Sequence, residues 1–130
     1  LPMLVTSVGR AYLSFCPERE RLEILESLRR SDDEFDNLVH NQEYVQKIIA
    51  TTLKRGYGVR DDGFHWKRKT SSIAVPIMKG PRVVATLAIT FISSAATAEE
   101  IAERHLDALR SAAHKIELKV KDAKLSEAEM

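Results

Sequence analysis

The sequence predicts an α+β domain with an antiparallel sheet flanked by helices, and two observations carry this prediction. The first is a strand-turn-strand pattern from Thr70 to Ile92, in which two β-branched, apolar runs meet at Lys79-Gly80-Pro81. The second is a series of amphipathic helical patterns on both sides of that hairpin. With 130 residues, 44% hydrophobic and 30% charged, the chain has the size and composition of one globular domain with a core.

The two faces of the predicted hairpin differ in side-chain size, because successive residues of a strand point to opposite faces. In the second strand, one face is apolar throughout: Val83, Ala85, Leu87, Ile89 and Phe91. The other face has smaller side chains and two hydroxyls: Val84, Thr86, Ala88, Thr90 and Ile92. We expect a helix to cover the first face, and the second is suited to line a cavity. The alternative is an ordinary half-buried hairpin.

Pro76 interrupts the first strand of the hairpin. Proline has no N–H to give to a ladder, so it indicates a strand whose local edge is free, or a bulge.

Three helices are predicted before the hairpin, over residues 6–15, 18–30 and 41–55, with residues 31–36 as a polar connection between the second and third. Gly56 is the predicted stop of the third helix. The spacing predicts these core-facing residues: Val8, Ala11, Tyr12 and Phe15; Leu22, Leu25 and Leu28; Tyr44, Ile48, Ile49 and Leu53.

The start of the first helix allows two interpretations. Thr6 and Ser7 are good capping residues, and Gly9 is a poor helix former that costs about 1 kcal/mol relative to alanine. Free amides and hydroxyls at a helix N-terminus suit an anion. The alternative is that Thr6 and Ser7 only cap the helix and Gly9 admits a neighbouring backbone.

A short strand over residues 57–60 precedes an unusual loop over residues 61–69, DDGFHWKRK. Its aromatic residues beside three bases fit a lid over an aromatic carboxylate, and equally a solvated surface loop. After the hairpin, Thr97 and Glu100 form a capping box that begins the last helix. The predicted buried stripe of that helix is Ile101, Leu106, Leu109, Ala113, Ile116 and Val120. We place the domain at residues 1–122 and a frayed helix or tail at 123–130.

Composition excludes several classes of protein. The net charge of +1 gives no field to hold nucleic acid, so we do not expect this chain to bind DNA alone. Cys16 is the only cysteine, which excludes an internal disulfide and suits a cytoplasmic location. No stretch has the length of a membrane span, and the start at Leu1-Pro2 suggests a piece of a longer protein.

The sequence shows no catalytic or metal-binding constellation. The four histidines lack ligand spacing, so we predict no metal and no cofactor. Cys16 with His40 as nucleophile and base is less plausible than a small buried Cys16, and we predict that the chain is not an enzyme.

Three segments together resemble the effector-binding domain of the IclR (isocitrate lyase regulator) family of bacterial transcription factors. They are LPMLVTSVGRAYLSFCPE, LKRGYGVRDDG and TSSIAVPIMKGPRVVATLAI, in this order and at these separations. The last segment is most similar to the branch that regulates catabolism of hydroxyphenylpropionate and related aromatic acids.

The resemblance implies a GAF/PAS-like antiparallel sheet flanked by helices. It also implies that the chain lacks the first strands of the full domain and the N-terminal winged helix-turn-helix that binds DNA. The implied partners are a small carboxylate effector and further copies of the chain in a homodimer or homotetramer.

The resemblance also implies effector-binding positions, all of them matched by motif: Ser7, Val8, Asp61, Ser72, Ala74, Ala88 and Thr90. The amides of Ser7 and Val8 would meet a carboxylate, Asp61 or Asp62 would provide the acidic position, and Ser72 and Thr90 would orient the ligand. Ala88 stands where relatives have serine, which favours a bulkier, less polar effector such as an aromatic acid.

Two other functions stay open from the sequence. One is a GAF/PAS-type small-ligand sensor domain of a signalling protein, which a kinase or cyclase domain upstream would identify. The weaker one is a small enzyme, which turnover of a bound ligand would identify.

Overall fold

The computed structural model describes residues 2–60 and 69–129, with side chains described up to residue 123. The helices that precede the sheet are α1 (Ser7–Phe15), α2 (Glu18–Arg29), the 3-10 helix η1 (Phe35–His40) and α3 (Gln42–Arg55). The strands are β1 (Gly58–Val59), β2 (Thr70–Lys79) and β3 (Arg82–Ile92), and α4 (Ala98–Glu129) ends the chain.

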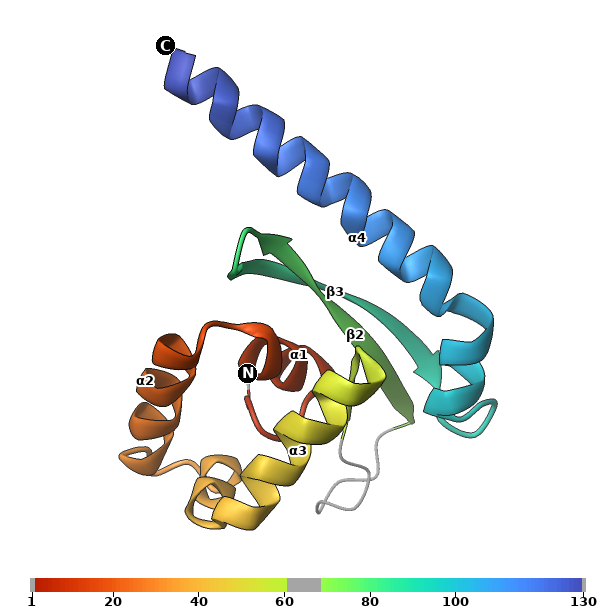
Figure 1. The fold of residues 1–130 in the computed structure, drawn as a ribbon. Helices are drawn as coiled ribbons and strands as arrows, with labels where there is room; N and C mark the ends of the chain where they lie inside the picture. The colour runs from red at the N-terminus through yellow and green to blue at the C-terminus, as the bar shows by residue number, and fades with distance from the viewer. Residues whose placement is uncertain (1, 61–68, 130) are drawn as a thin grey trace.

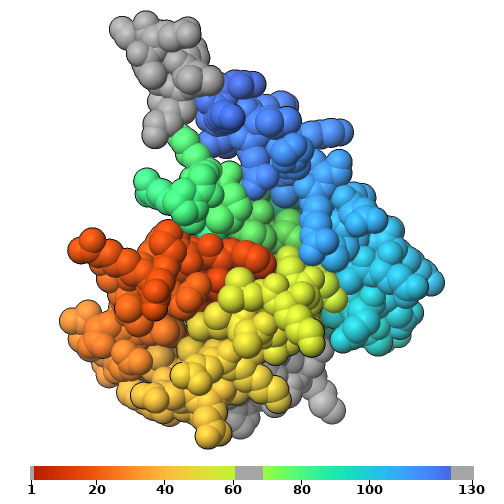
Figure 2. Space-filling model, viewed as in Figure 1, coloured from red at the N-terminus to blue at the C-terminus, as the bar shows by residue number. Residues whose placement is uncertain are grey.

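An antiparallel sheet of three strands in the order β1-β2-β3 separates two layers of helix. Helix α4 crosses one face, while α1 lies on the other face and α2 and α3 pack behind it (Figure 1). The filled surface shows the same layers, with α4 along one side of the strands and α1 to α3 on the opposite side (Figure 2). The predicted α+β class, with helices on both sides of an antiparallel sheet, is confirmed.

The α4 face of the sheet contains the larger apolar core. Ile73, Val75 and Ile77 of β2 are 0–3% exposed and pack against α4. Leu87, Ile89 and Phe91 of β3 border this core, as expected for the apolar face of the hairpin. Glu100 donates its backbone N–H to Thr97 Oγ1 (3.2 Å), and the Thr97 N–H is donated to Glu100 Oε1 (3.3 Å), which confirms the predicted capping box.

Pro76 lies in a part of β2 that has no paired strand on its β1 side among the described residues. Strand β1 pairs only with Ile73 and Ala74, so among the described residues no strand continues along that edge of β2 at Pro76. A bulge follows directly, between Ile77 and Met78. The Met78 N–H there is donated to Glu117 Oε2 of α4 at 2.6 Å, which ties the helix to the strand.

A second core lies between the helices, and it corrects two predictions. Leu25 and Leu28 are buried in it, but Leu22 is 59% exposed. Residues three apart on a helix drift by about 60°, so the predicted leucine stripe is wider than the contact. On α3, Thr52 is buried and Leu53 is 46% exposed.

The connection predicted over residues 31–36 was also partly wrong, since η1 begins at Phe35. Val39 of η1 is 2% exposed and completes the core between the helices.

Helix α1 buries a different set of residues from the predicted one: Ser7, Gly9, Ala11, Leu13 and Ser14. Of the predicted core face only Ala11 is fully buried, whereas Val8, Tyr12 and Phe15 are half-buried. The reason is the close approach of β1, because a Cβ at Gly58 would meet the carbonyl oxygen of Ser7 at 2.1 Å. The bulky side chains therefore point to the sides of the contact.

Two glycines of the helical part confirm their predicted roles. A Cβ at Gly9 would meet the Met3 carbonyl oxygen at 2.5 Å, so Gly9 does admit a neighbouring backbone. Gly56 ends α3 in the left-handed conformation with φ of 86°, and its N–H is donated to the Thr52 carbonyl.

Candidate functional site

The start of α1 is fixed by its cap. Thr6 Oγ1 accepts the Gly9 N–H at 3.0 Å and donates to the Pro2 carbonyl at 2.7 Å. The first amides of a helix have no partner within the helix. Because Thr6 takes the Gly9 amide, the amides of Ser7 and Val8 are left for a partner outside the helix.

Ser7 joins this helix start to the sheet. Its side chain is 2% exposed, and its hydroxyl makes a short hydrogen bond with the hydroxyl of Ser72 on β2. Two predicted site residues that are 65 positions apart in the sequence are thus in direct contact.

The other predicted sheet residues lie beside this contact. Ser72 pairs across the sheet with Thr90, and Ala74 pairs with Ala88. Ala74 is fully buried, Ser72 is half-buried, and Ala88 and Thr90 are exposed. Paired residues on one face of a sheet are about 5 Å apart at Cβ, so these four form one contiguous patch.

A small apolar cavity of about 240 Å³ opens next to the helix start, on this face of the sheet. It is lined by Met3, Val8, Gly9, Tyr12 and Thr86. Of these only Val8 was predicted as a site residue. Thr86 continues the Ala88 and Thr90 alternation by one step, and Tyr12 follows Val8 by one helical turn, so the same patterns contained the signal for both.

Tyr12 is held at the cavity wall by a short hydrogen bond from its hydroxyl to Glu20 Oε1. This bond raises the pKa of Tyr12 above its ordinary value, with burial and the Glu20 charge adding to the effect. Tyr12 is therefore a neutral lining residue of the cavity at physiological pH.

The surroundings of Cys16 decide between a nucleophile and a buried hydrophobic residue. Burial is the main cause that raises the pKa of the Cys16 thiol, which is 3% exposed and donates to the Leu13 carbonyl at 3.3 Å. A nucleophilic thiolate needs a lowered pKa, so Cys16 fits the buried hydrophobic residue and not the nucleophile.

Asp61, and the loop proposed as a lid, lie outside the described residues apart from Lys69.

The described part of the chain gathers no group of three His, Cys, Asp or Glu side chains that would suit a metal ion. In the same ranges, no helix is both long and apolar enough to span a membrane.

An antiparallel sheet with helices on both sides is also the fold of solved bacterial transcriptional regulators. Residues 1–118 match the model of the C-terminal domain of the bacterial transcriptional regulator IclR. The chain belongs to the IclR family.

Solved structures agree with this assignment. A transcriptional regulator from Rhodococcus sp. RHA1 is similar at a TM-score of 0.69 and 25% identity, over 95% of this chain and 49% of that one. An IclR family regulator from Brucella abortus is similar at 0.68 and 27% identity, over 89% and 43% of the two chains. This chain thus spans about half the length of these regulators.

A third structure is the inducer-binding domain of the transcription factor PobR from Acinetobacter, a double mutant solved with 3-hydroxybenzoic acid. Its TM-score is 0.64 at 18% identity, over 90% of this chain and 66% of that one, which shows a shared fold alone. These three structures are of transcriptional regulators or of a domain of one. The absence of catalytic activity in this chain stays a prediction.

Proposed function

We propose that this chain is the effector-sensing and oligomerisation domain of an IclR-type regulator, and that it senses a small carboxylate, in particular an aromatic acid. The observation that carries the proposal is the Ser7–Ser72 hydrogen bond, which joins the free amides at the start of α1 to the hydroxylated face of the sheet. Effector binding would be coupled to DNA binding by an N-terminal winged helix-turn-helix of the longer protein.

We call the start of α1, the hydroxylated patch of the sheet and the small apolar cavity beside them the effector cradle. Its chemistry suits an acid with a hydrocarbon body. The amides of Ser7 and Val8 are placed to bind a carboxylate, each charge-assisted hydrogen bond contributing roughly 1.5–3 kcal/mol. Met3, Val8 and the Tyr12 ring provide apolar walls, and Ser72, Thr86 and Thr90 provide hydroxyls. Ala88 leaves more space and less polarity than a serine would, which favours an aromatic ring.

Two features of the relatives support the proposal. The PobR domain was solved with 3-hydroxybenzoic acid, an aromatic acid. Membership of a regulator family also favours this function over a sensor domain of a kinase or cyclase.

The signal would be transmitted by linkage. An effector that binds one arrangement of a homodimer or homotetramer better shifts the equilibrium toward it, and coupling of about 1–3 kcal/mol is typical. That range is enough to change operator occupancy severalfold.

A thermal-shift panel tests the proposal, with 3-hydroxybenzoate, benzoate and pyruvate added to the 130-residue chain. A ligand at 100 times its dissociation constant adds about 2.7 kcal/mol to the unfolding free energy. We expect an aromatic acid to raise the melting temperature, and Thr90→Val to reduce that rise.

The matched control is Thr51→Val on α3, because Thr51 lines neither the cavity beside the start of α1 nor the hydroxylated patch of β2 and β3. It should leave the rise unchanged. A shift with pyruvate and none with an aromatic acid would contradict the aromatic assignment. No shift with any acid would contradict the sensing site itself.

A further inference from the structure

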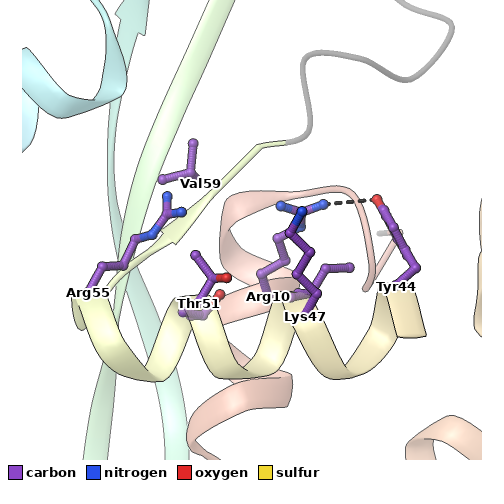
Figure 3. Close-up of a pocket in the computed structure, with 8 residues that line it drawn as sticks. Arg10, Tyr44, Lys47, Thr51, Arg55 and Val59 are labelled. Carbon is purple, nitrogen blue, oxygen red and sulfur yellow. Dashed lines mark hydrogen bonds between the residues drawn. The ribbon is translucent and has the colours of Figure 1, made fainter. Parts of the chain in front are cut away.

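A second cavity lies on the far side of α1 from the effector cradle, between α1, α3 and β1. It encloses about 240 Å³, and its polar lining consists of Arg10, Tyr44, Lys47, Thr51, Thr52 and Arg55 (Figure 3). Residues on a helix are separated by about 100°, so Arg10 is about 200° from both Val8 and Tyr12. The two cavities therefore share a helix but no side chain.

Helix α3 supplies most of the polar lining from one face. Tyr44, Lys47, Thr51 and Arg55 follow one another at three- and four-residue steps, which stacks their side chains along one side of a helix. In Figure 3 these side chains rise from α3 toward Arg10 and Val59. This alignment directs two cations and two hydroxyls into the same space.

Arg10 closes the cavity from α1 and is held in position. Its Nε donates to the Leu4 carbonyl at 2.8 Å, and its Nη2 donates to the Tyr44 hydroxyl at 3.0 Å. The planar shape of the guanidinium is fixed in advance of any ligand, which lowers the entropy lost on binding.

Three of the described residues that line the cavity are basic. Arg10, Lys47 and Arg55 line the cavity, and no Asp or Glu does so among the residues that the structure describes. Arg55 stacks over the Tyr57 ring at 5.6 Å, a contact that leaves its charge in place. In the described ranges Lys47 takes part in no salt bridge.

We propose that this cavity binds a small dianion of the phosphate class, either inorganic phosphate or the phosphate group of a small ester. Arginine forks match the oxygens of a phosphate, and Lys47 adds a compact charge with three donors. The Thr51 hydroxyl supplies a further donor. A monocarboxylate would neutralise only one of the two charges of Lys47 and Arg55, whereas a dianion matches both. The site therefore discriminates by charge against the ligand proposed for the effector cradle.

Isothermal titration of inorganic phosphate into the 130-residue chain, at ionic strength held constant with sodium chloride, tests this site. We expect one phosphate per chain, and Lys47→Gln should raise the dissociation constant about tenfold, since it removes one charge-assisted contact. Lys54→Gln is the matched control because Lys54 is an exposed lysine of the same helix that does not line the cavity. It should change the constant less than about twofold.

Three results would overturn the proposal: equal losses in Lys47→Gln and Lys54→Gln, no binding of phosphate, or binding of acetate as tight as that of phosphate. A phosphate ester in place of the inorganic ion separates the two sources of the ligand. Tighter binding of the ester assigns the site to a metabolite, and equal binding assigns it to the phosphate group alone. Thr90→Val should leave phosphate binding unchanged, so this site and the effector cradle are tested independently.

Discussion

The two faces of the sheet are built by different means. The α4 face is filled by large aliphatic side chains, and Ile73, Val75 and Ile77 are almost entirely buried there. The α1 face is built from small residues and backbone, with Gly58 in contact with α1 and Ser7 bonded to Ser72. The α4 face buries apolar area, which stabilises the fold. The α1 face buries less apolar area, but it allows close approach of the backbones and leaves hydroxyls exposed.

Stability and binding therefore depend on opposite faces of the sheet. Ala88 and Thr90 on the α1 face are exposed, whereas the residues of β2 that face α4 are buried. A ligand on the α1 face can therefore form contacts without disturbing the core beneath α4. Substitutions on each face should show that division, from the largest effect to the smallest.

Ile73→Ala should have the largest effect. Ile73 is 0% exposed in the α4 core, and truncating such a residue costs about 2–5 kcal/mol of unfolding free energy through lost burial and a cavity. Urea denaturation measures the loss. The control is Val84→Ala at an exposed position of β3, which should cost less than about 1 kcal/mol. Equal losses would show that burial beneath α4 does not set the cost of truncation.

Gly58→Ala should follow, at about 1–3 kcal/mol, because the new methyl would press on the backbone of α1. A Cβ there would meet the Ser7 carbonyl oxygen at 2.1 Å, and the backbone cannot yield without moving the helix from the sheet. Denaturation should report the loss, and binding of aromatic acid should weaken with it. Unchanged stability would mean that α1 is not fixed against β1.

Ser72→Ala should cost about 1 kcal/mol, because it leaves the Ser7 hydroxyl buried without its partner. The double variant Ser7→Ala with Ser72→Ala should recover part of that loss, since no polar group is then left unsatisfied. A double-mutant cycle with denaturation measures the coupling. A coupling energy near zero would argue against the hydrogen bond.

Ionisation of the Cys16 thiol should have the smallest effect on stability, whereas burial of the thiol should clearly slow its reaction. Burial raises the pKa of its thiol, so the folded state holds the proton more tightly than the unfolded state does. Its contribution to stability is therefore complete below the ordinary thiol pKa and is lost as pH rises toward the raised value. Near pH 8, a thiol reagent should label the folded chain at least about tenfold more slowly than the urea-unfolded chain. Equal rates would show an accessible thiolate.

The cationic cavity adds a third region to this comparison. Helix α1 separates it from the effector cradle, and its lining is charged where that of the cradle is apolar and hydroxylated. Four properties stay predictions: the effector, the oligomeric state, the domain boundary at residue 122 and the cytoplasmic location. The thermal-shift panel tests the effector cradle, and the phosphate titration tests the cationic cavity.

The sequence by itself determined the local features. The hairpin turn, the Thr97–Glu100 capping box and the Gly56 stop were all predicted, because each depends on residues within a few positions of one another. The motif match predicted Ser7, Ser72 and Thr90 as site residues, and the structure brings Ser7 and Ser72 into contact. The local features follow from backbone conformation and hydrogen-bonding preferences that need no distant partner.

Only the tertiary structure decided which side of each helix is buried. Helix α1 has apolar residues on several sides, and the approach of Gly58 selects the small face with Ser7 and Ala11. Leu22 and Leu53 are exposed because the neighbouring elements do not reach them. The gathering of Arg10, Lys47 and Arg55 in one cavity also depends on the packing of α1 against α3, which no local pattern encodes.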